Sequence, residues 1–451
     1  MDAIASYIET QHARLNEELH ALLSLPTVVA HGRAIPETAQ FVRHSLEQRG
    51  AQVQLIPMPN GSAPLLYAVF GAGQGKRRLL IYDHYDVQPA DPEELWHTPP
   101  FVPTVRDGKL YARGVADNKG NLMLRIQALE ALQAVAGELP CEVAFVIEGE
   151  EEIGSPNLPY FTQQYRDLLV GEGMLWETGR RDVNDRPEIT CGVKGMAYVE
   201  LVARGAAYDQ HSQFATIVPN PAWRLVWALN TIKGVDGRVQ LAGFYDAIRP
   251  PTAAEEAALQ SMPDTDDALL AELGLPAFLD NLRGVERLRR HLFEPTCNIA
   301  GFGAGYTGAG SKTVLPCEAR VKLDFRLVPD MSPEVVVQQL RAHLDQHGFG
   351  DVEIITHNGS YPARSALGSR LVQALASAAE AVYHLPPVLA PTMPGTGPMY
   401  DLAQQFGIPA AGGAGCGYAG NQIHAPNENI RMDDYWLAMR WMAEFVRHFA
   451  A

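Results

Sequence analysis

Two apolar segments of this chain run directly into clusters of ionisable side chains. The sequence from Ile81 to Pro89, I-Y-D-H-Y-D-V-Q-P, leads from an apolar strand into His84 and Asp86. The strand-like run Val143–Ile147 leads in the same way into three consecutive glutamates at 150–152. In an open α/β sheet, reactive groups collect just beyond the carboxyl ends of the strands. The two clusters therefore predict a sheet whose strands end at one shared polar edge.

Helical and strand-like segments alternate around these clusters. Helices are expected at Glu37–Arg49 and Lys119–Val135, and strands at Gln52–Ile56, Leu65–Phe70, Arg78–Tyr82 and Cys141–Ile147. This rhythm is typical of strands joined by helices that cover both faces of one sheet. We therefore expect an α/β fold, with a three-layer unit built on a mostly parallel sheet.

The pattern changes in the middle of the chain. Strands are expected at Met196–Ala203, Ala319–Leu327 and Val352–Thr356, helices after Pro221 and Pro333, and a variable stretch broken by Pro and Asp at Arg249–Pro276. A long helix at Ser369–Tyr383 and a glycine-rich loop then resemble the first part again. The prediction is that residues 1–194 and 361–451 form the main unit, and that residues 195–360 form a smaller α+β unit inserted into it.

Length and charge bound the possible partners. A chain of 451 residues exceeds one simple core and suggests two or three compact units. Basic side chains number 36 and acidic ones 52, which gives a net charge of −16, and no cluster of Lys and Arg interleaves with aromatics. Nucleic acid is therefore not an expected partner. A G-x-G-x-x-G motif at 303–308 follows no clear strand and opens no helix, so a dinucleotide site is not expected either.

The cysteines and the N-terminal segment bear on the compartment. The five cysteines are scattered and include no C-x-x-C pair, so neither a disulfide framework nor a structural zinc knuckle is expected. Met1–Leu23 places apolar residues at helical spacing among charged ones, which is typical of an amphipathic helix and not of a secretory signal. No apolar run approaches the roughly 20 residues that span a bilayer. A soluble, cytoplasmic protein without a membrane partner is expected.

The side chains of His84 and Asp86 suit a metal site. An imidazole can bind a divalent ion while a nearby carboxylate accepts the other ring N–H and fixes the tautomer. Residues two apart lie on the same side of an extended chain, which places Asp86 within reach of His84. The alternative is a surface loop that contains H-x-D by chance.

The glutamates at 150–152 and Asp117 strengthen the metal interpretation. Three adjacent carboxylates repel one another, and partial burial would raise their pKa values unless cations are present. A solvated acidic turn is the alternative, but the preceding strand looks buried. Asp117 stands where a helix begins, so it either caps this helix or bridges two metal ions. In combination the clusters indicate a two-metal hydrolase, in which one glutamate binds metal and its neighbour acts as general base.

Together these motifs resemble the co-catalytic zinc exopeptidase family that includes carnosinase, cytosolic non-specific dipeptidase, glutamate carboxypeptidase, aminoacylase and the acetylornithine and succinyl-diaminopimelate deacylases. The resemblance covers essentially the whole chain. It implies that His84 binds one metal ion, that Asp117 bridges both, and that Glu152 binds the other. It further implies that Glu151 is the general base and that Asp86 supports His84.

Two further ligands follow from the same resemblance. Glu177, in L-W-E-T-G, matches the fourth carboxylate, where dipeptidases of the family usually have aspartate and where glutamate is more familiar in carboxypeptidases and deacylases. His424, in N-Q-I-H-A-P-N-E, matches the final ligand, although alone it would indicate only a loop histidine with satisfied hydrogen bonds. The family often has a cis peptide bond after the bridging aspartate, which is expected here between Asp117 and Asn118.

Substrate contacts are implied for three more residues. His211, in Y-D-Q-H-S, resembles the histidine that in dimeric relatives reaches into the partner's active site to polarise the scissile carbonyl. Arg326, in D-F-R-L-V-P-D, resembles the arginine that grips the substrate carboxylate, although it alternates with apolar residues and could simply face water. Thr396, in P-G-T-G-P, matches a loop that offers backbone amides and a hydroxyl to the same carboxylate. The inserted unit is accordingly expected to serve as a lid and dimerisation domain.

The chain is thus expected to be a homodimeric metallopeptidase with two divalent ions per subunit, zinc in preference to manganese or cobalt. The expected reaction is hydrolysis of the amide bond next to a free carboxylate in a dipeptide or short peptide, by a metal-bound hydroxide with Glu151 as base. The alternative is an N-acyl amino acid deacylase or a carboxypeptidase that uses the same site. A catalytically silent binding protein is a more remote alternative.

Overall fold

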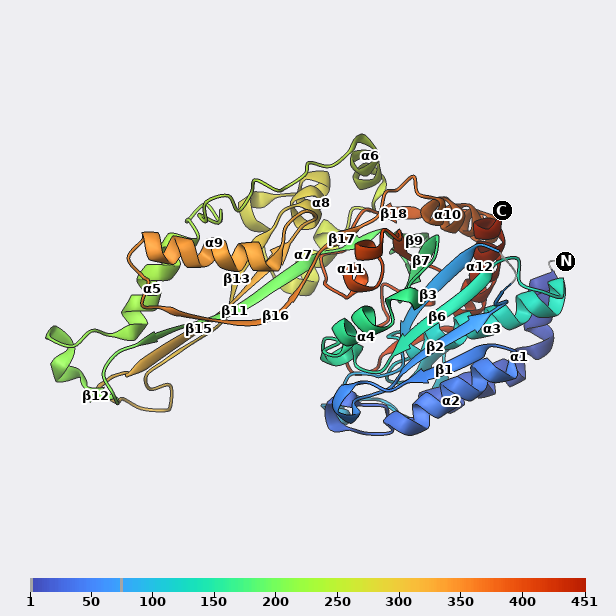
Figure 1. The fold of residues 1–451 in the computed structure, drawn as a ribbon, viewed down its shortest axis with the longest axis horizontal. Helices are drawn as coiled ribbons and strands as arrows, with labels where there is room; N and C mark the ends of the chain where they lie inside the picture. Colours follow the sequence, from blue (N-terminus) through green and yellow to red (C-terminus); the bar gives the residue numbers. More distant parts are fainter. Residues whose placement is uncertain (1–2, 74–75) are drawn as a thin grey trace.

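A ten-stranded sheet dominates the computed structural model, which describes residues 3–73 and 76–451 (Figure 1). Its strand order is β1-β2-β6-β3-β7-β19-β9-β8-β20, and β18 pairs with β9. The strands are β1 Gln52–Ile56, β2 Leu65–Phe70, β3 Arg78–His84, β6 Glu142–Glu148, β7 Gly173–Trp176, β8 Arg180–Arg181, β9 Pro187–Thr190, β18 Val388–Ala390, β19 Ala410–Gly412 and β20 Gly417–Tyr418. Since β3 runs parallel to both β6 and β7, the carboxyl ends of these three central strands meet at one edge.

Helices cover both faces of this sheet, and the predicted three-layer α/β fold is confirmed. One face carries α1 Ala3–Leu23, α2 Ile35–Gln48, α3 Lys119–Ala136, α10 Arg370–Tyr383 and α12 Met432–Ala450, and the other carries α4 Leu158–Gln164 and α11 Met399–Leu402. The first two residues of the predicted N-terminal helix lie outside the described residues.

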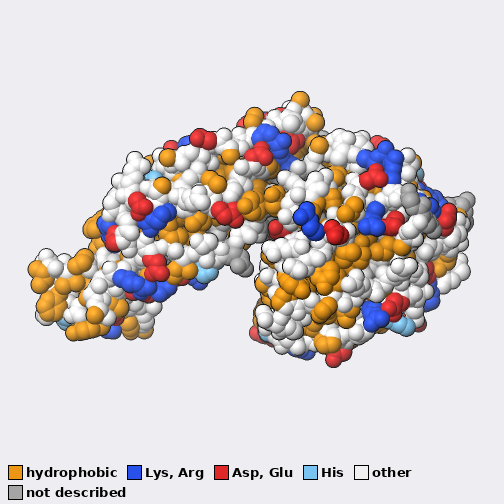
Figure 2. Space-filling model, viewed as in Figure 1, with side chains coloured by type: hydrophobic (Ala, Val, Ile, Leu, Met, Phe, Trp, Pro, Cys, Tyr) orange, Lys and Arg blue, Asp and Glu red, His pale blue; other side chains and the backbone are white. Residues whose placement is uncertain are grey.

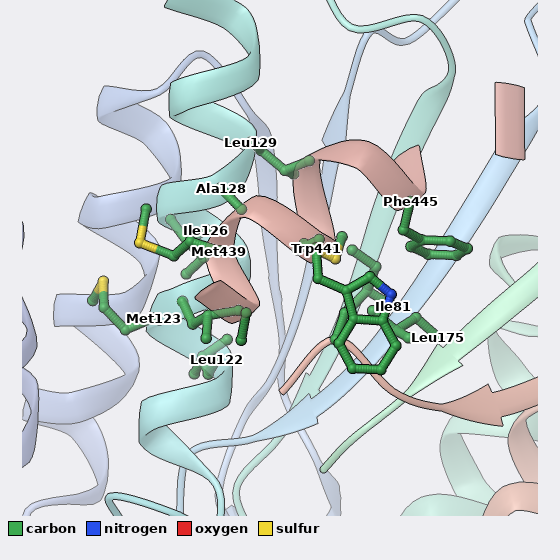
Figure 3. Packing of buried hydrophobic residues seen from close by; sticks show 14 of the residues in the cluster. Ile81, Leu122, Met123, Ile126, Ala128, Leu129, Leu175, Met439, Trp441 and Phe445 are labelled. Carbon is green, nitrogen blue, oxygen red and sulfur yellow. The ribbon is translucent and has the colours of Figure 1, made fainter. Parts of the chain in front are cut away.

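The alternation of side chains along β3 explains the two cores. Leu79 and Ile81 pack in the core beneath α3 and α12, whereas Leu80 and Tyr82 pack in the core beneath α4 and α11. Figure 3 shows part of the first core, in which Ile81 of β3 and Trp441 of α12 belong to the same buried cluster. A strand that is apolar on both sides is typical of the centre of a parallel sheet. Burial on both faces therefore fixes the position of the residues that follow β3.

A second, antiparallel sheet of four strands lies away from the first (Figure 1). Its order is β13-β15-β11-β16, with β11 Gly195–Arg204, β13 Thr296–Ala304, β15 Glu318–Leu327 and β16 Glu353–Ser360. Helices α5 Pro221–Ile232 and α9 Pro333–Gln346 pack on it, and α8 Gly284–Phe293 precedes β13. We refer to residues 195–360 as the inserted segment. Figure 2 shows a deep notch between the inserted segment and the rest of the molecule.

Short strand pairs connect these parts. The chain crosses between the two sheets where β10 Gly192–Val193 pairs with β17 Ala363–Arg364. At the far end of the inserted segment, β12 Gln210–His211 pairs with β14 Val314–Leu315. A three-stranded sheet is formed by β4 Thr104–Arg106, β5 Lys109–Tyr111 and β21 Asn429–Arg431, and its β21–β5 pair brings the last loop of the chain against the loop before α3.

Two expectations from the sequence differ from the structure. The stretch predicted as variable, Arg249–Pro276, contains helices α6 Ala253–Ser261 and α7 Asp266–Leu273. Thr252 and Glu255 form a capping box at the start of α6, a signal that the prolines and aspartates obscured. The G-x-G-x-x-G motif was expected to follow no strand, but Gly303 lies within β13. The dinucleotide interpretation still fails, because no helix opens after the motif.

Among residues 3–73 and 76–451, no helix combines the length and apolar character needed to cross a lipid bilayer.

Candidate metal centre

The ends of the three central strands bring four of the predicted residues to one place. His84 is the last residue of β3, and Glu177 follows directly after β7. Glu151 and Glu152 lie in a single 3-10 turn, Glu151–Ile153, just beyond the end of β6. Because β3 pairs in parallel register with both neighbours, these loops leave the sheet at the same edge.

The carboxylate of Asp117 lies at the centre of the predicted ligands. Its Oδ1 is 3.0 Å from Nε2 of His84, and its Oδ2 is 3.2 Å from Nε2 of His424. His84 Nε2 is also 3.3 Å from Oε2 of Glu177, while His424 Nε2 is 3.1 Å from Oε2 of Glu152. The five side chains thus form two half-sites that share Asp117. The first half-site adds His84 and Glu177, and the second adds Glu152 and His424.

The loop around Asp117 favours the bridging interpretation over helix capping. Asn118, and not Asp117, occupies the N-cap position of α3, and no side chain caps that helix. The peptide bond between Asp117 and Asn118 is cis, as the family resemblance implies. The side chain of Asp117 is therefore directed to the two histidines and not to the helix amides.

The donors present fit divalent metal ions. Ligand atoms of His84, Asp117 and Glu152 all lie within 4.8 Å of one another. Oε2 of Glu177 is buried and accepts no hydrogen bond, although it lies 3.3 Å from a ring nitrogen of His84. A buried carboxylate oxygen without a partner is costly, and a cation between it and the imidazole would satisfy both. Imidazole and carboxylate donors of this kind accept zinc, manganese or cobalt.

The charges of the site also favour bound cations. Burial, reinforced by the charge of Glu151, holds the pKa of Glu177 well above its usual range. Burial and the neighbouring carboxylates raise the pKa of Glu151 to about 7 despite the attraction of His84. Hydrogen bonds to Asp117 and Glu152 raise the pKa of His424 to about 10. These pKa shifts indicate that the cluster stabilises positive charge, which bound cations can supply.

Asp86 connects His84, a predicted metal ligand, to the turn of the predicted base. Its carboxylate accepts the backbone N–H of Glu152 at 3.0 Å and of Glu151 at 3.3 Å. Nδ1 of His84 is 3.4 Å from the same carboxylate and 3.1 Å from the backbone carbonyl of Asp86, which can accept the ring N–H. One buried aspartate therefore orients both the imidazole and the 3-10 turn.

Glu151 stands between two cavities. One cavity, of about 480 Å³, is lined by Glu151 together with Asp117, Glu177 and His424. The other, of about 440 Å³, is lined by Glu151 together with Arg326 and Thr396. Nη1 of Arg326 donates a hydrogen bond of 2.6 Å to the hydroxyl of Thr396, so the structure brings these two predicted substrate contacts together.

His211 is the one predicted site residue that lies apart from this cluster. It is exposed in β12, at the end of the inserted segment farthest from the large sheet (Figure 1). Its Nδ1 accepts the backbone N–H of Gln213, and its Nε2 is 3.3 Å from the hydroxyl of Thr313. Within one chain, His211 lines neither of the two cavities around Glu151.

Glu428 holds the ligand loops together and was not singled out from the sequence. It is fully buried, and its carboxylate accepts the backbone N–H groups of Gly114, Ala116 and Asp117 and a hydrogen bond from Arg113. The loop of His424 is thereby fastened to the loop of Asp117. A glutamate four residues after a histidine in an irregular loop has no periodicity that would reveal this contact.

Two more polar side chains support the ligands from behind. Gln88 donates to Oε2 of Glu152 from its amide and to Oε1 from its backbone N–H. This role of Gln88 could have been predicted from the sequence, because Gln88 stands two residues after Asp86 and alternate residues of an extended chain lie on the same side. Arg125, buried in α3, donates to the carbonyls of Trp176 and Thr178 on either side of Glu177. The contacts of Arg125 could not have been predicted, because its position within an apolar helix does not indicate which carbonyl groups it contacts.

Comparisons with known proteins agree with this geometry. The sequence matches peptidase family M20/M25/M40 over residues 80–448. It is 28% identical to the Beta-Ala-His dipeptidase of Rattus norvegicus over 426 residues, covering 89% of this chain and 84% of that protein. It is also 28% identical to the Cys-Gly metallodipeptidase dug1 of Schizosaccharomyces pombe over 374 residues, covering 76% and 75%. Among solved structures, the M20 family metallo-carboxypeptidase Sso-CP2 of Sulfolobus solfataricus is similar with a TM-score of 0.90 and 37% identity, covering 97% of this chain and 99% of that one.

Proposed function

The chain belongs to peptidase family M20/M25/M40 and is a metallopeptidase, and we propose that it hydrolyses the amide bond before the C-terminal residue of dipeptides or short peptides. One observation carries this proposal: Arg326 and Thr396 line the same cavity as Glu151. A guanidinium suits a carboxylate, so a substrate held there by its C-terminus would present its last amide bond to Glu151. The relatives named as Beta-Ala-His and Cys-Gly dipeptidases support a dipeptide substrate.

We assign two divalent metal ions to the half-sites, with zinc as the native metal. His84, Asp117 and Glu177 would hold one ion, and Asp117, Glu152 and His424 the other. Bound ions of this kind polarise a carbonyl oxygen and lower the pKa of a water molecule. The buried oxygen of Glu177 that accepts no hydrogen bond supports the first half-site independently of family membership.

The protons are moved by Glu151. Its carboxylate is placed by the turn that Asp86 fixes, and it lines both cavities, so it can reach a water on one side and the leaving nitrogen on the other. It takes a proton from the attacking water and delivers a proton to the amine as the C–N bond breaks. Arg326 and Thr396 hold the carboxylate of the departing residue during both transfers.

We further propose a homodimer in which His211 completes the partner's site. Its exposure at the end of the inserted segment, outside both cavities of its own chain, supports this role. There it would donate a hydrogen bond to the carbonyl oxygen that becomes negatively charged during attack.

We also propose a cytoplasmic location, since the five free thiols are compatible with a reducing compartment.

A carboxypeptidase is the second candidate function. The 37% identity to Sso-CP2 and the presence of glutamate at position 177 favour it. The two candidates differ in what lies on the N-terminal side of the cleaved bond, where the 480 Å³ cavity would receive either a free ammonium or a continuing peptide.

The deciding experiment is an activity panel on protein reconstituted with zinc, manganese or cobalt. Free dipeptides, the same dipeptides with an acetylated N-terminus, tetrapeptides and N-acetyl amino acids are compared by kcat/KM. A dipeptidase cleaves the free dipeptides fastest, and a carboxypeptidase cleaves the blocked dipeptides and tetrapeptides at least as well. Turnover of N-acetyl amino acids alone would reject both in favour of a deacylase, and no metal-stimulated turnover on any substrate would reject the proposed function.

A further inference from the structure

The 440 Å³ cavity beside Glu151 contains an acidic group that the proposed mechanism does not use. Asp401, in α11, lines this cavity together with Arg326 and Thr396. Helices α4 and α11 supply one wall and the inserted segment supplies the other. In Figure 1, α4 lies on the flank of the large unit that is nearest to the inserted segment. A residue whose C-terminal carboxylate is held by Arg326 would therefore direct its side chain into the space that Asp401 borders.

The carboxylate of Asp401 has no partner among the described residues. No described side chain or backbone N–H donates a hydrogen bond to it, and no described Lys, Arg or His lies within 4.0 Å of it. Other half-buried carboxylates are paired, such as Glu18 and Glu130, which both pair with Arg49. Burial raises the pKa of Asp401, as expected for a partly enclosed carboxylate without a cation.

The cations that line the two cavities beside Asp401 do not neutralise its carboxylate. Arg326 instead donates to Thr396 and lies 3.9 Å from Asp324. Arg166 borders a second hollow, of about 420 Å³, that adjoins Asp401 from the other side, but it is exposed and forms no ion pair with Asp401. The cavity thus contains Arg326, which can bind the C-terminal carboxylate of a substrate, and Asp401, whose carboxylate can bind a cationic group.

The rest of the lining suits an aliphatic chain. Apolar surface in the same cavity comes from Leu158, Pro159, Met196 and Pro398. Lysine and arginine bury a stem of methylene groups and carry the charge at the tip, so they match apolar walls that lead to a carboxylate. A neutral aliphatic residue would leave Asp401 desolvated without a partner, which costs free energy.

We propose that this cavity binds the side chain of a C-terminal lysine or arginine, with Asp401 pairing with its charged tip, and that Asp401 makes the enzyme prefer substrates with a basic last residue. This inference rests on the proposed function, because it uses Arg326 to hold the C-terminus. The net charge of −16 would also favour the approach of cationic peptides.

The test compares substrates that differ only in the charge of the last side chain. The kcat/KM values for Ala-Lys and Ala-norleucine are measured on the zinc-loaded enzyme, since norleucine keeps the whole aliphatic stem of lysine and lacks the ammonium. We expect a preference for lysine of about tenfold or more, in the range of a partly desolvated charge pair. In Asp401→Asn this ratio should fall to about one. Because both substrates are measured on the same preparation, a loss of folded protein cancels from the ratio.

The matched control is Asp167→Asn, which removes an exposed carboxylate from a neighbouring turn outside the cavity. Its lysine-to-norleucine ratio should equal that of the unaltered enzyme. The reversed dipeptide Lys-Ala places the charge before the cleaved bond, and its kcat/KM should not depend on the charge of residue 401. A ratio near one in the unaltered enzyme, or a ratio that Asp401→Asn leaves unchanged, would overturn the proposal.

A binding measurement separates this inference from the proposed function. Calorimetric titration of the zinc-loaded protein with the free amino acids should give a Kd for L-lysine about tenfold below that for L-norleucine, and Asp401→Asn should remove the difference. If no peptide is cleaved but this binding pattern holds, the proposed function fails while the basic side-chain site stands. If peptides are cleaved without discrimination by charge, the basic side-chain site alone fails.

Discussion

The two oxygens of one carboxylate organise the candidate metal centre. Oδ1 of Asp117 meets His84 and Oδ2 meets His424, so a single side chain joins ligands that come from opposite ends of the chain. The short turn after β6 directs three neighbouring glutamates to different contacts. Glu152 joins the second half-site, Glu151 faces the two cavities, and Glu150 accepts a hydrogen bond from Asn157 instead.

Because these glutamates make different contacts, their substitutions should affect kcat to different extents. Glu151→Gln keeps the shape of the side chain but removes its ability to accept a proton, so kcat should fall by about 10²- to 10⁴-fold, the usual contribution of a general base. The KM and the metal content should stay close to those of the unaltered enzyme, because Glu151 is not one of the five ligands. Steady-state kinetics together with elemental analysis of the protein check both points.

Glu150→Gln is the matched control for this substitution. Its side chain lies one residue away and bonds Asn157, a contact that a glutamine oxygen can also accept. It should therefore change kcat by less than about threefold, as for a substitution that leaves the proton transfer intact. Equal losses in the two variants would assign the effect to the turn and not to the base.

The elements that position the site differ in how well the sequence predicts them. Strands β1 and β2 have the expected bounds, and β3, β6 and α3 differ by no more than two residues at either end, because apolar runs and helical spacing mark them clearly. His84, Asp117 and Glu152 were predicted as ligands from motifs at β3, before α3 and after β6, whereas Glu177 and His424 were predicted from the family resemblance. The contacts of Glu428 were not predicted, since they depend on the β21–β5 pair, whose two strands are more than 300 residues apart in the chain.

Glu428 should accordingly control how firmly the metal centre is assembled. Glu428→Gln replaces one carboxylate oxygen with an NH2 group, so either the backbone N–H of Gly114 or those of Ala116 and Asp117 lose their acceptor. Residues that orient metal ligands typically contribute about 10- to 100-fold to metal affinity. We expect a loss of that size in zinc affinity, measured by competition with a chelator of known affinity.

Glu142→Gln serves as the comparison for that variant. Glu142 is also buried and paired with an arginine, Arg78, but it lies at the opposite end of β6 from the metal centre. Its substitution should lower thermal stability without changing zinc affinity. If both variants lower zinc affinity to the same extent, Glu428 acts only through general stability.

In the molecule as a whole, β12, which carries His211, lies at the end of the inserted segment that is far from the large sheet and its candidate metal ligands (Figure 1). We propose that residues 195–360 form a separate domain, joined to the rest where β10 and β17 pair.

The edge strand β13 pairs only with β15 among the described residues, and Phe302 on it is 46% exposed. On α5, the stacked rings of Trp223 and Trp227 are each 56% exposed. An unpaired edge and exposed aromatics of this kind are typical of surfaces that pair with another chain.

This surface predicts a dimer that a single charge on the edge strand weakens. Light scattering after gel filtration should give twice the chain mass of 49.3 kDa. Phe302→Lys places a charge on the open edge of β13 and should shift the mass toward the monomer, with a loss of activity because His211 no longer reaches a partner. Val170→Lys, an exposed position outside the inserted segment, should change neither property. An unaltered enzyme that is monomeric and fully active would contradict the proposed role of His211.

The pairing of the two half-sites around Asp117 can be observed in crystals grown with zinc, by anomalous diffraction on both sides of the zinc absorption edge. An arrangement of two half-sites around one shared carboxylate predicts two zinc peaks per chain, one beside His84 and Glu177 and the other beside Glu152 and His424, with the carboxylate of Asp117 between them. A single peak that leaves one half-site empty at saturating zinc, or peaks only at positions away from Asp117, would contradict it.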